Sequence, residues 1–162
     1  DWTQERGNLF QAVKTEKTVM WVILSLIIAV AAFNIISMLV MVVTDKQSDI
    51  AILKTMGARD GTVMRIFMIQ GSVIGIVGTA LGVVGGILLA MNIGAVVPFL
   101  EQLFGFSLFP SDIYYITELP SDLQYSDVTK FALMSLAMSL LSTIYPSWRA
   151  SRTHPAEALS YE

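Results

Sequence analysis

The 162-residue chain is 54% hydrophobic and only 14% charged, and its formal net charge is −3. That balance excludes an ordinary soluble domain and is typical of a membrane protein, as is the mean hydropathy of +0.65. The chain has no cysteine and one histidine, His154, which excludes a disulfide framework and a thiolate or histidine metal site. We therefore expect an all-α membrane protein, a transmembrane helix bundle with no cofactor or metal of its own. The opening on Asp1 is typical of the later part of a longer protein.

The first apolar stretch, residues 18–43, carries no charge and exceeds the roughly 20 residues that a helix needs to cross hydrocarbon. The polar residues 1–17 before it are expected to form a lead-in helix that continues into the span. Within the span 18–43, Asn34 is the only strongly polar residue, and an amide in hydrocarbon needs a partner. Two interpretations fit Asn34: an ordinary hydrogen bond between helices, or a place in the lining of a substrate cavity.

Residues 44–65 form a charged, helix-prone segment between two apolar stretches. Its apolar residues recur at helical spacing, which predicts a short helix outside the bilayer with an apolar stripe. Gly57 is placed to end that helix as a C-terminal cap. The pattern alone fits two surfaces equally, a protein partner or the lipid headgroups.

The second span, residues 66–97, is marked by small-xxx-small repeats of glycine. On a helix these glycines fall within an arc of roughly 100°, which predicts a strip where another helix packs closely. The chain has no phosphate-binding glycine motif, so we do not expect it to bind a nucleotide. The glycines assigned to packing are Gly71, Gly75, Gly78, Gly82 and Gly86.

The loop at 98–126 is acidic, aromatic and free of Lys and Arg. It is expected to fold over the membrane surface, either packed on the helix ends or as the lip of a cavity. The third span is residues 127–145, with Ser135, Ser139 and Ser142 as a second packing face. Pro146 is expected to end it, and the tail 146–162 to close with a short helix that begins at Pro155.

Orientation follows from the distribution of Lys and Arg. Segment 44–65 has four of them and loop 98–126 has none. The positive-inside rule then places 44–65 and the tail 146–162 in the cytoplasm. The loop and the lead-in residues 1–17 are expected on the periplasmic side.

Four stretches of the sequence carry a resemblance to a known family: DWTQERGNLFQAVKTEK, AVAAFNIISMLVMVV, DKQSDIAILKTMGA and LLSTIYPSWRASRTHPAEALSYE. In them the chain resembles the C-terminal half of the LolC/LolE-type lipoprotein-releasing permeases, in the wider FtsX/MacB-type group of ABC transporter permeases. The ends resemble LolC and the outer loop SDIYYITELPSDL resembles LolE, which favours a hybrid subunit.

The resemblance implies a subunit with four transmembrane helices in the bacterial inner membrane, of which these three are the second to fourth. It implies a second LolC/LolE-like permease as homodimer or heterodimer partner, and a LolD-like ATPase dimer that holds ATP and magnesium. The complex would pass triacylated lipoprotein from the membrane lipid to a LolA-like periplasmic carrier. This chain would not be an enzyme by itself, and no nucleic acid is involved.

The resemblance also assigns site residues. Segment 45–57 matches the helix that couples such permeases to their ATPase. The coupling residues are then Lys46, Asp49, Ile50, Leu53, Lys54, Met56 and Gly57. The candidates for the lipoprotein cavity are Phe33, Asn34, Ile36, Met38, Leu119 and Pro120. Three other hypotheses stay open: a MacB-like efflux permease, an FtsX-like regulator of cell-wall hydrolysis, and a membrane scaffold that transports nothing.

Overall fold

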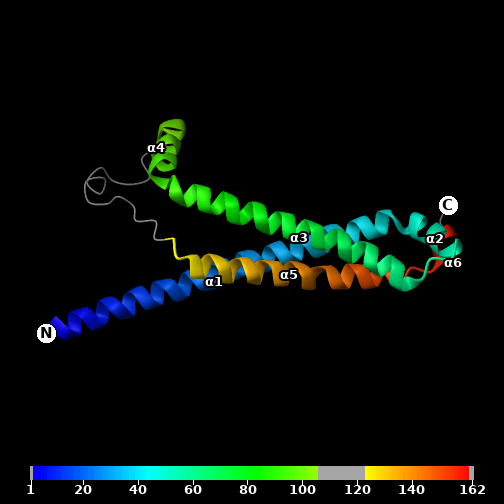
Figure 1. Cartoon of the computed structure of the whole chain (residues 1–162), viewed down its shortest axis with the longest axis horizontal. Helices are drawn as coiled ribbons and strands as arrows, with labels where there is room; N and C mark the ends of the chain where they lie inside the picture. The colour runs from blue at the N-terminus through cyan, green and yellow to red at the C-terminus, as the bar shows by residue number, and fades with distance from the viewer. Residues whose placement is uncertain (1, 106–122, 161–162) are drawn as a thin grey trace. The chain divides into compact units, whose positions relative to one another are not determined.

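The computed structural model describes residues 2–105 and 123–160, and in these ranges the regular structure is entirely helical. This confirms the expected all-α fold class. Three helices are long and apolar enough to cross a membrane, by length and composition (Figure 1). The elements are α1 (Trp2–Asp45), α2 (Gln47–Thr55), α3 (Asp60–Met91), α4 (Ile93–Phe104), α5 (Tyr125–Ser151) and α6 (Pro155–Leu159).

Helix α1 contains both the expected lead-in segment and the expected first span, without a break between them. It has 44 residues, which at about 1.5 Å per residue is roughly twice the thickness of the hydrocarbon core. No proline interrupts the stretch, and residues 1–17 are mostly good helix formers. The polar part of α1 therefore extends beyond the apolar part as one continuous rod.

The connection from α2 to α3 is a glycine-capped turn. Gly57 has φ +103°, a conformation that side chains rarely tolerate. Its N–H donates to Lys54 O at 3.1 Å, and the N–H of Ala58 donates to Leu53 O at 3.0 Å. These two bonds form a Schellman motif, which satisfies carbonyls at the helix end. The prediction that Gly57 ends the helix is confirmed.

The chain divides into two compact units. The first comprises residues 1–73 and 137–162, and the second comprises residues 74–136. In the first unit, α2 lies beside α6 (Figure 1). The core of this unit gathers apolar side chains from α1, α2, α3 and α5. These are Val43, Ile50, Val63, Phe67 and Ala150.

Helices α1, α3 and α5 meet at one glycine of the first unit. A Cβ atom added to Gly71 would lie 2.8 Å from the Cβ of Thr143 and 3.4 Å from Cδ1 of Leu39. Real Cβ atoms essentially never approach other atoms as closely as 2.8 Å. The missing side chain of Gly71 is therefore what lets α5 come so near to α3.

Two helices continue through a proline where a boundary was expected. Pro98 lies inside α4, which ends at Phe104 with Gly105 as a left-handed cap. Pro146 lies inside α5, which continues to Ser151, so the expectation that Pro146 ends the helix is wrong. A proline in a helix removes the bond to the carbonyl four residues earlier, and its ring crowds that carbonyl. Pro146 is nevertheless fully buried within α5. The final helix begins at Pro155 as predicted.

Candidate functional site

Helix α2 turns one face into the protein. Ile50 is 3% exposed and Ala51 is fully buried. Ile50 belongs to the same core cluster as Val43 of α1, Phe67 of α3 and Ala150 of α5. Burial of an isoleucine is worth about 1.5–3 kcal/mol, so Ile50 holds α2 against the helix ends. Its place inside the core differs from its expected place on a contact surface.

The opposite face of α2 carries an exposed apolar stripe. Ile52 and Leu53 are about half exposed, and Met56 is 79% exposed. An apolar surface with polar residues at its edge is typical of a site where another protein docks. The polar edge is the ion pair between Lys46 and Asp49, whose side-chain atoms are 3.1 Å apart. The stripe of Ile52, Leu53 and Met56 is the best-formed docking surface on α2.

Lys54 joins the end of α2 to two other helices. Its Nζ donates to Ser151 O at 2.6 Å and to Thr153 O at 2.7 Å. The same nitrogen pairs with Asp60 Oδ1 at 2.9 Å, and the Lys54 side chain is only 9% exposed. Lys54 was expected in contact with a partner, but these bonds point its ammonium group into the chain.

The ion pair also explains the charge state of Asp60, which lies before the apolar stretch that begins at residue 66. A hydrogen bond from Lys54 and the positive charge of Lys54 hold the pKa of Asp60 below its ordinary value. Burial acts in the opposite direction but less strongly than Lys54, and the charges of Arg152 and His154 lower the pKa a little further. Asp60 is therefore ionised at neutral pH and balances the charge of Lys54.

The candidate cavity residues of α1 lie mostly on the face that this chain leaves uncovered. Phe33, Asn34 and Met38 are exposed, whereas Ile36 is half-buried. The Asn34 side chain has no hydrogen bond to any residue in the part of the chain that the structure describes. Among the described residues, no partner therefore supports the interpretation that Asn34 makes a hydrogen bond between helices of this chain. Leu119 and Pro120 lie outside the described residues.

The residues assigned to helix packing differ in their surroundings. Gly71 meets Thr143, and Gly75 is also buried. Gly78, Gly82 and Gly86 have open space where a side chain would be. That these three pack against another helix stays a prediction.

The polar face of α5 is longer than the sequence indicated. Ser139 and Ser142 are buried and Ser135 is half-buried. The buried face also includes Thr143 and Ser147, which the sequence analysis missed. The signal was present, because Ser135, Ser139, Thr143 and Ser147 recur at steps of four. The pattern was read for serine alone, which omitted Thr143, and the assumption that Pro146 ends the helix omitted Ser147. The Ser147 hydroxyl donates to Thr143 O at 2.6 Å, which satisfies it inside its own helix.

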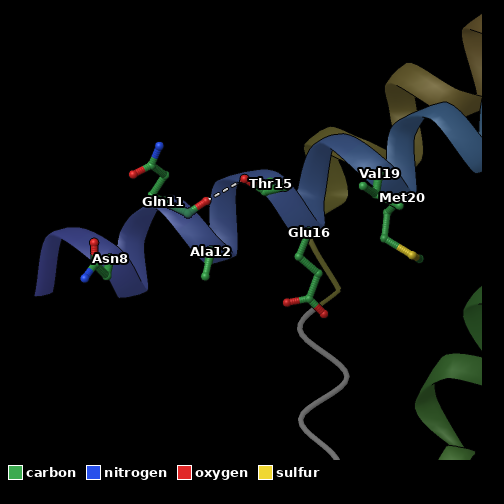
Figure 2. Close-up of a pocket in the computed structure, with 7 residues that line it drawn as sticks. All are labelled: Asn8, Gln11, Ala12, Thr15, Glu16, Val19 and Met20. Atoms are coloured by element: carbon green, nitrogen blue, oxygen red, sulfur yellow. Dashed lines mark hydrogen bonds between the residues drawn. The ribbon is translucent and has the colours of Figure 1, made fainter. Parts of the chain in front are cut away.

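A shallow hollow lies along the polar part of α1 (Figure 2). Every residue that lines it comes from this one helix, and Thr15 donates its hydroxyl hydrogen to Gln11 O at 2.9 Å. No cluster of metal-binding side chains occurs among the residues in the ranges 2–105 and 123–160. The hollow has no charged pair or convergent donors, so it provides no chemistry by itself. Its lining residues are Asn8, Gln11, Ala12, Thr15, Glu16, Val19 and Met20.

Three long apolar helices, with a core where α1, α2, α3 and α5 pack together, define a multi-pass membrane protein of the all-helical class. Comparison with protein families identifies the family. The FtsX-like permease C-terminal family matches residues 21–155. The chain belongs to this family, and it is a permease-type transmembrane domain.

Individual relatives are similar over the whole chain. The lipoprotein-releasing system transmembrane protein LolC of Xylella fastidiosa (strain Temecula1) is 56% identical over 162 residues, 100% of this chain and 39% of the relative. LolC of Neisseria meningitidis serogroup B is 54% identical with the same coverage. LolE of Haemophilus influenzae is 39% identical over 160 residues, 99% of this chain and 38% of the relative. The resemblance to LolC/LolE-type permeases is confirmed, and the chain spans about two fifths of these relatives.

Proposed function

We propose that this chain is the transmembrane part of an ATP-driven complex that releases lipoproteins from the outer leaflet of the bacterial inner membrane. The observation that carries the proposal is the 56% identity, over the full chain, to a protein named for the lipoprotein-releasing system. The similar proteins favour this hypothesis over the efflux, cell-wall and scaffold alternatives. The chain would act as a permease subunit, and the chemistry of ATP hydrolysis, with ATP and magnesium, would belong to a separate ATPase.

The exposed stripe on α2 supports the ATPase-docking part of the proposal. Ile52, Leu53 and Met56 offer apolar area that no described residue covers. Helix α2 is held by the buried Ile50 on one side and by Lys54 at its end. A short helix held in this way presents a rigid surface, and rigid surfaces lose little entropy on binding. A LolD-like ATPase dimer would dock there.

The uncovered face of α1 supports the substrate part of the proposal. Phe33 and Met38 are exposed apolar side chains within the span, and Asn34 lies between them in sequence. A triacylated lipoprotein has acyl chains that each gain about 0.8 kcal/mol per CH₂ on burial in lipid. Extraction therefore needs both an apolar lining and energy from ATP. With a second permease subunit, this face would line the cavity, and a LolA-like carrier would receive the released lipoprotein.

The two subunit types can be compared within one organism. LolC and LolE of Haemophilus influenzae are 40% and 39% identical to this chain, although LolC relatives from two other organisms reach 56% and 54%. Similarity to both types within one organism agrees with the hybrid subunit that the sequence stretches indicated. We propose a dimer of two permease subunits, and the purification described next distinguishes a homodimer from a heterodimer.

The test is affinity purification of the full-length protein from its native membrane in mild detergent, followed by mass spectrometry. We expect a small ABC ATPase together with triacylated lipoprotein. A second, different permease would identify a heterodimer, and its absence a homodimer. An ATPase without lipoprotein, or no ATPase at all, would contradict the proposed function. A matched preparation with Leu53→Asp should keep the permease and lose the ATPase.

A further inference from the structure

The ammonium group of Lys54 lies where three helices end. Lys54 is one residue from the end of α2, Ser151 is the last residue of α5, and Asp60 is the first residue of α3. The three bonds of Nζ measure 2.6 Å to Ser151 O, 2.7 Å to Thr153 O and 2.9 Å to Asp60 Oδ1. An ammonium group has three N–H donors. All three are therefore used, and each binds a different residue.

Each of these bonds has a physical reason. The last carbonyls of a helix have no partner in the helix and carry a partial negative charge, which a lysine neutralises. The first turn of a helix favours an acidic residue for the opposite reason, so Asp60 suits the start of α3. A charge that is 9% exposed would be costly without such partners. Lys54 is thus placed inside the chain by its partners and is not a surface cation.

The other contacts of α2 are apolar packing, its contact with α6 and one local ion pair. Ile50 contributes through apolar burial, which has no preferred direction. The ion pair between Lys46 and Asp49 stays within the start of α2 and reaches no other helix. Hydrogen bonds depend strongly on distance and angle, so the Lys54 bonds set the position of α2 along and around its axis.

We propose that Lys54 is a positioning residue, which locks α2 to the ends of α5 and α3 so that a partner moving α2 moves both helices. The inference rests on the proposed function, because it needs an ATPase docked on α2. It separates two roles within one helix. Ile52, Leu53 and Met56 bind the partner, and Lys54 transmits its movement without contacting it. Loss of Lys54 should therefore uncouple the complex and leave it assembled.

The test uses the full-length complex in proteoliposomes, with three measurements on each variant. These are the amount of ATPase bound, the rate of ATP hydrolysis, and the lipoprotein released to a carrier per ATP hydrolysed. For Lys54→Met we expect normal ATPase content and a release per ATP that falls about ten-fold, as expected for lost bonds to a charged group. Lys54→Arg, which keeps the charge and the donors, should restore most of the ratio.

Two further variants control for charge and for folding. Arg59→Met removes an exposed cation from the turn before α3 and should leave the release per ATP unchanged. Lys54→Gln keeps amide donors without the charge and should uncouple like Lys54→Met. It takes the place of the methionine variant in the comparison if that variant inserts poorly. A structural defect alone would lower ATPase content and yield, whereas uncoupling lowers the ratio at constant content.

The outcomes separate this inference from the proposed function. A normal release per ATP in Lys54→Met and Lys54→Gln would overturn the positioning role. Loss of ATPase from these variants at normal permease yield, as in Leu53→Asp, would also overturn it, because Lys54 would then belong to the docking surface. A wild-type complex without an ATPase would overturn the proposed function, and that result appears before any variant is compared.

Discussion

At the scale of single residues, the same residue type has different roles along one helix. Gly71 leaves room for Thr143, whereas Gly78 and Gly82 of the same helix α3 have open space around them. The sequence gives all of these glycines the same helical arc. Only the neighbours of each glycine decide whether a side chain would clash, so their tolerance to substitution should differ.

We expect Gly71→Ala to destabilise the protein by about 1–3 kcal/mol, because the new Cβ must displace Thr143 in a packed joint. The measurement is thermal unfolding of the purified permease in detergent. The matched control is Gly78→Ala on the same helix, which adds the same methyl group to open space and should be neutral or slightly stabilising. Thr143→Ser, which removes one methyl group at the contact, should partly restore Gly71→Ala. Equal stability of the two glycine variants would contradict this packing.

At the scale of elements, α2 is a short helix with two unlike faces. Ile50 and Leu53 are three residues apart and look equivalent in the sequence, but Ile50 is 3% exposed and Leu53 is 44% exposed. The difference arises because α1, α3 and α5 all contribute to the core on the Ile50 side. One apolar residue therefore supports the fold, and the other is available to a partner.

This difference predicts opposite defects for two matched substitutions. Leu53→Asp should leave the fold intact and lower ATPase retention about ten-fold, as for a central interface residue. Ile50→Asp should instead destabilise the permease itself by about 3–5 kcal/mol, because an unpaired charge would be buried. Co-purification of the ATPase and the melting temperature of the permease distinguish the two. Full retention of the ATPase by Leu53→Asp would show that the stripe is not the docking surface.

At the scale of the whole molecule, charge distribution predicts which ends of the helices share a side of the membrane. Helix α2 and the tail carry basic residues, whereas the loop at 98–126 carries none. The association of α2 with α6 in the first unit agrees with a shared side for segment 44–65 and the tail. Two segments on the same side of a membrane are separated by an even number of spans. Helices α3 and α5 are the two spans between α2 and the tail.

The chain has no native cysteine, so single cysteines can report topology. We expect Arg59→Cys, in the exposed turn before α3, to be protected from a membrane-impermeant thiol reagent in intact cells whose outer membrane has been permeabilised. It should be labelled once the inner membrane is opened. Gln102→Cys at the end of α4 should be labelled in the intact cells. The background is a full-length protein freed of any other cysteines, and the reverse pattern would invert the proposed orientation.

Much of the fold could be predicted from local sequence. The apolar runs, Gly57 and Pro155 each act through their own backbone or through the bilayer, so three long apolar helices, the cap and the final helix were predicted. The bounds of the second span were not, because α3 ends at Met91 and α4 begins at Ile93 within the expected range 66–97. Less of the candidate site could be predicted from the sequence. The roles of Ile50 and Lys54 depend on residues about 100 positions away in sequence, such as Ala150 and Thr153. No periodicity within α2 contains that information.

The sequence by itself determined the class of protein, because the lengths and polarity of the apolar runs decide whether a helix can cross a membrane. Its likeness to known permeases determined the family. The tertiary structure alone decided which face of α2 is covered, that α5 continues through Pro146, and where the Lys54 ammonium group lies. These depend on which helix ends meet, and a buried charge or a close helix contact exists only when its partners are brought together by folding.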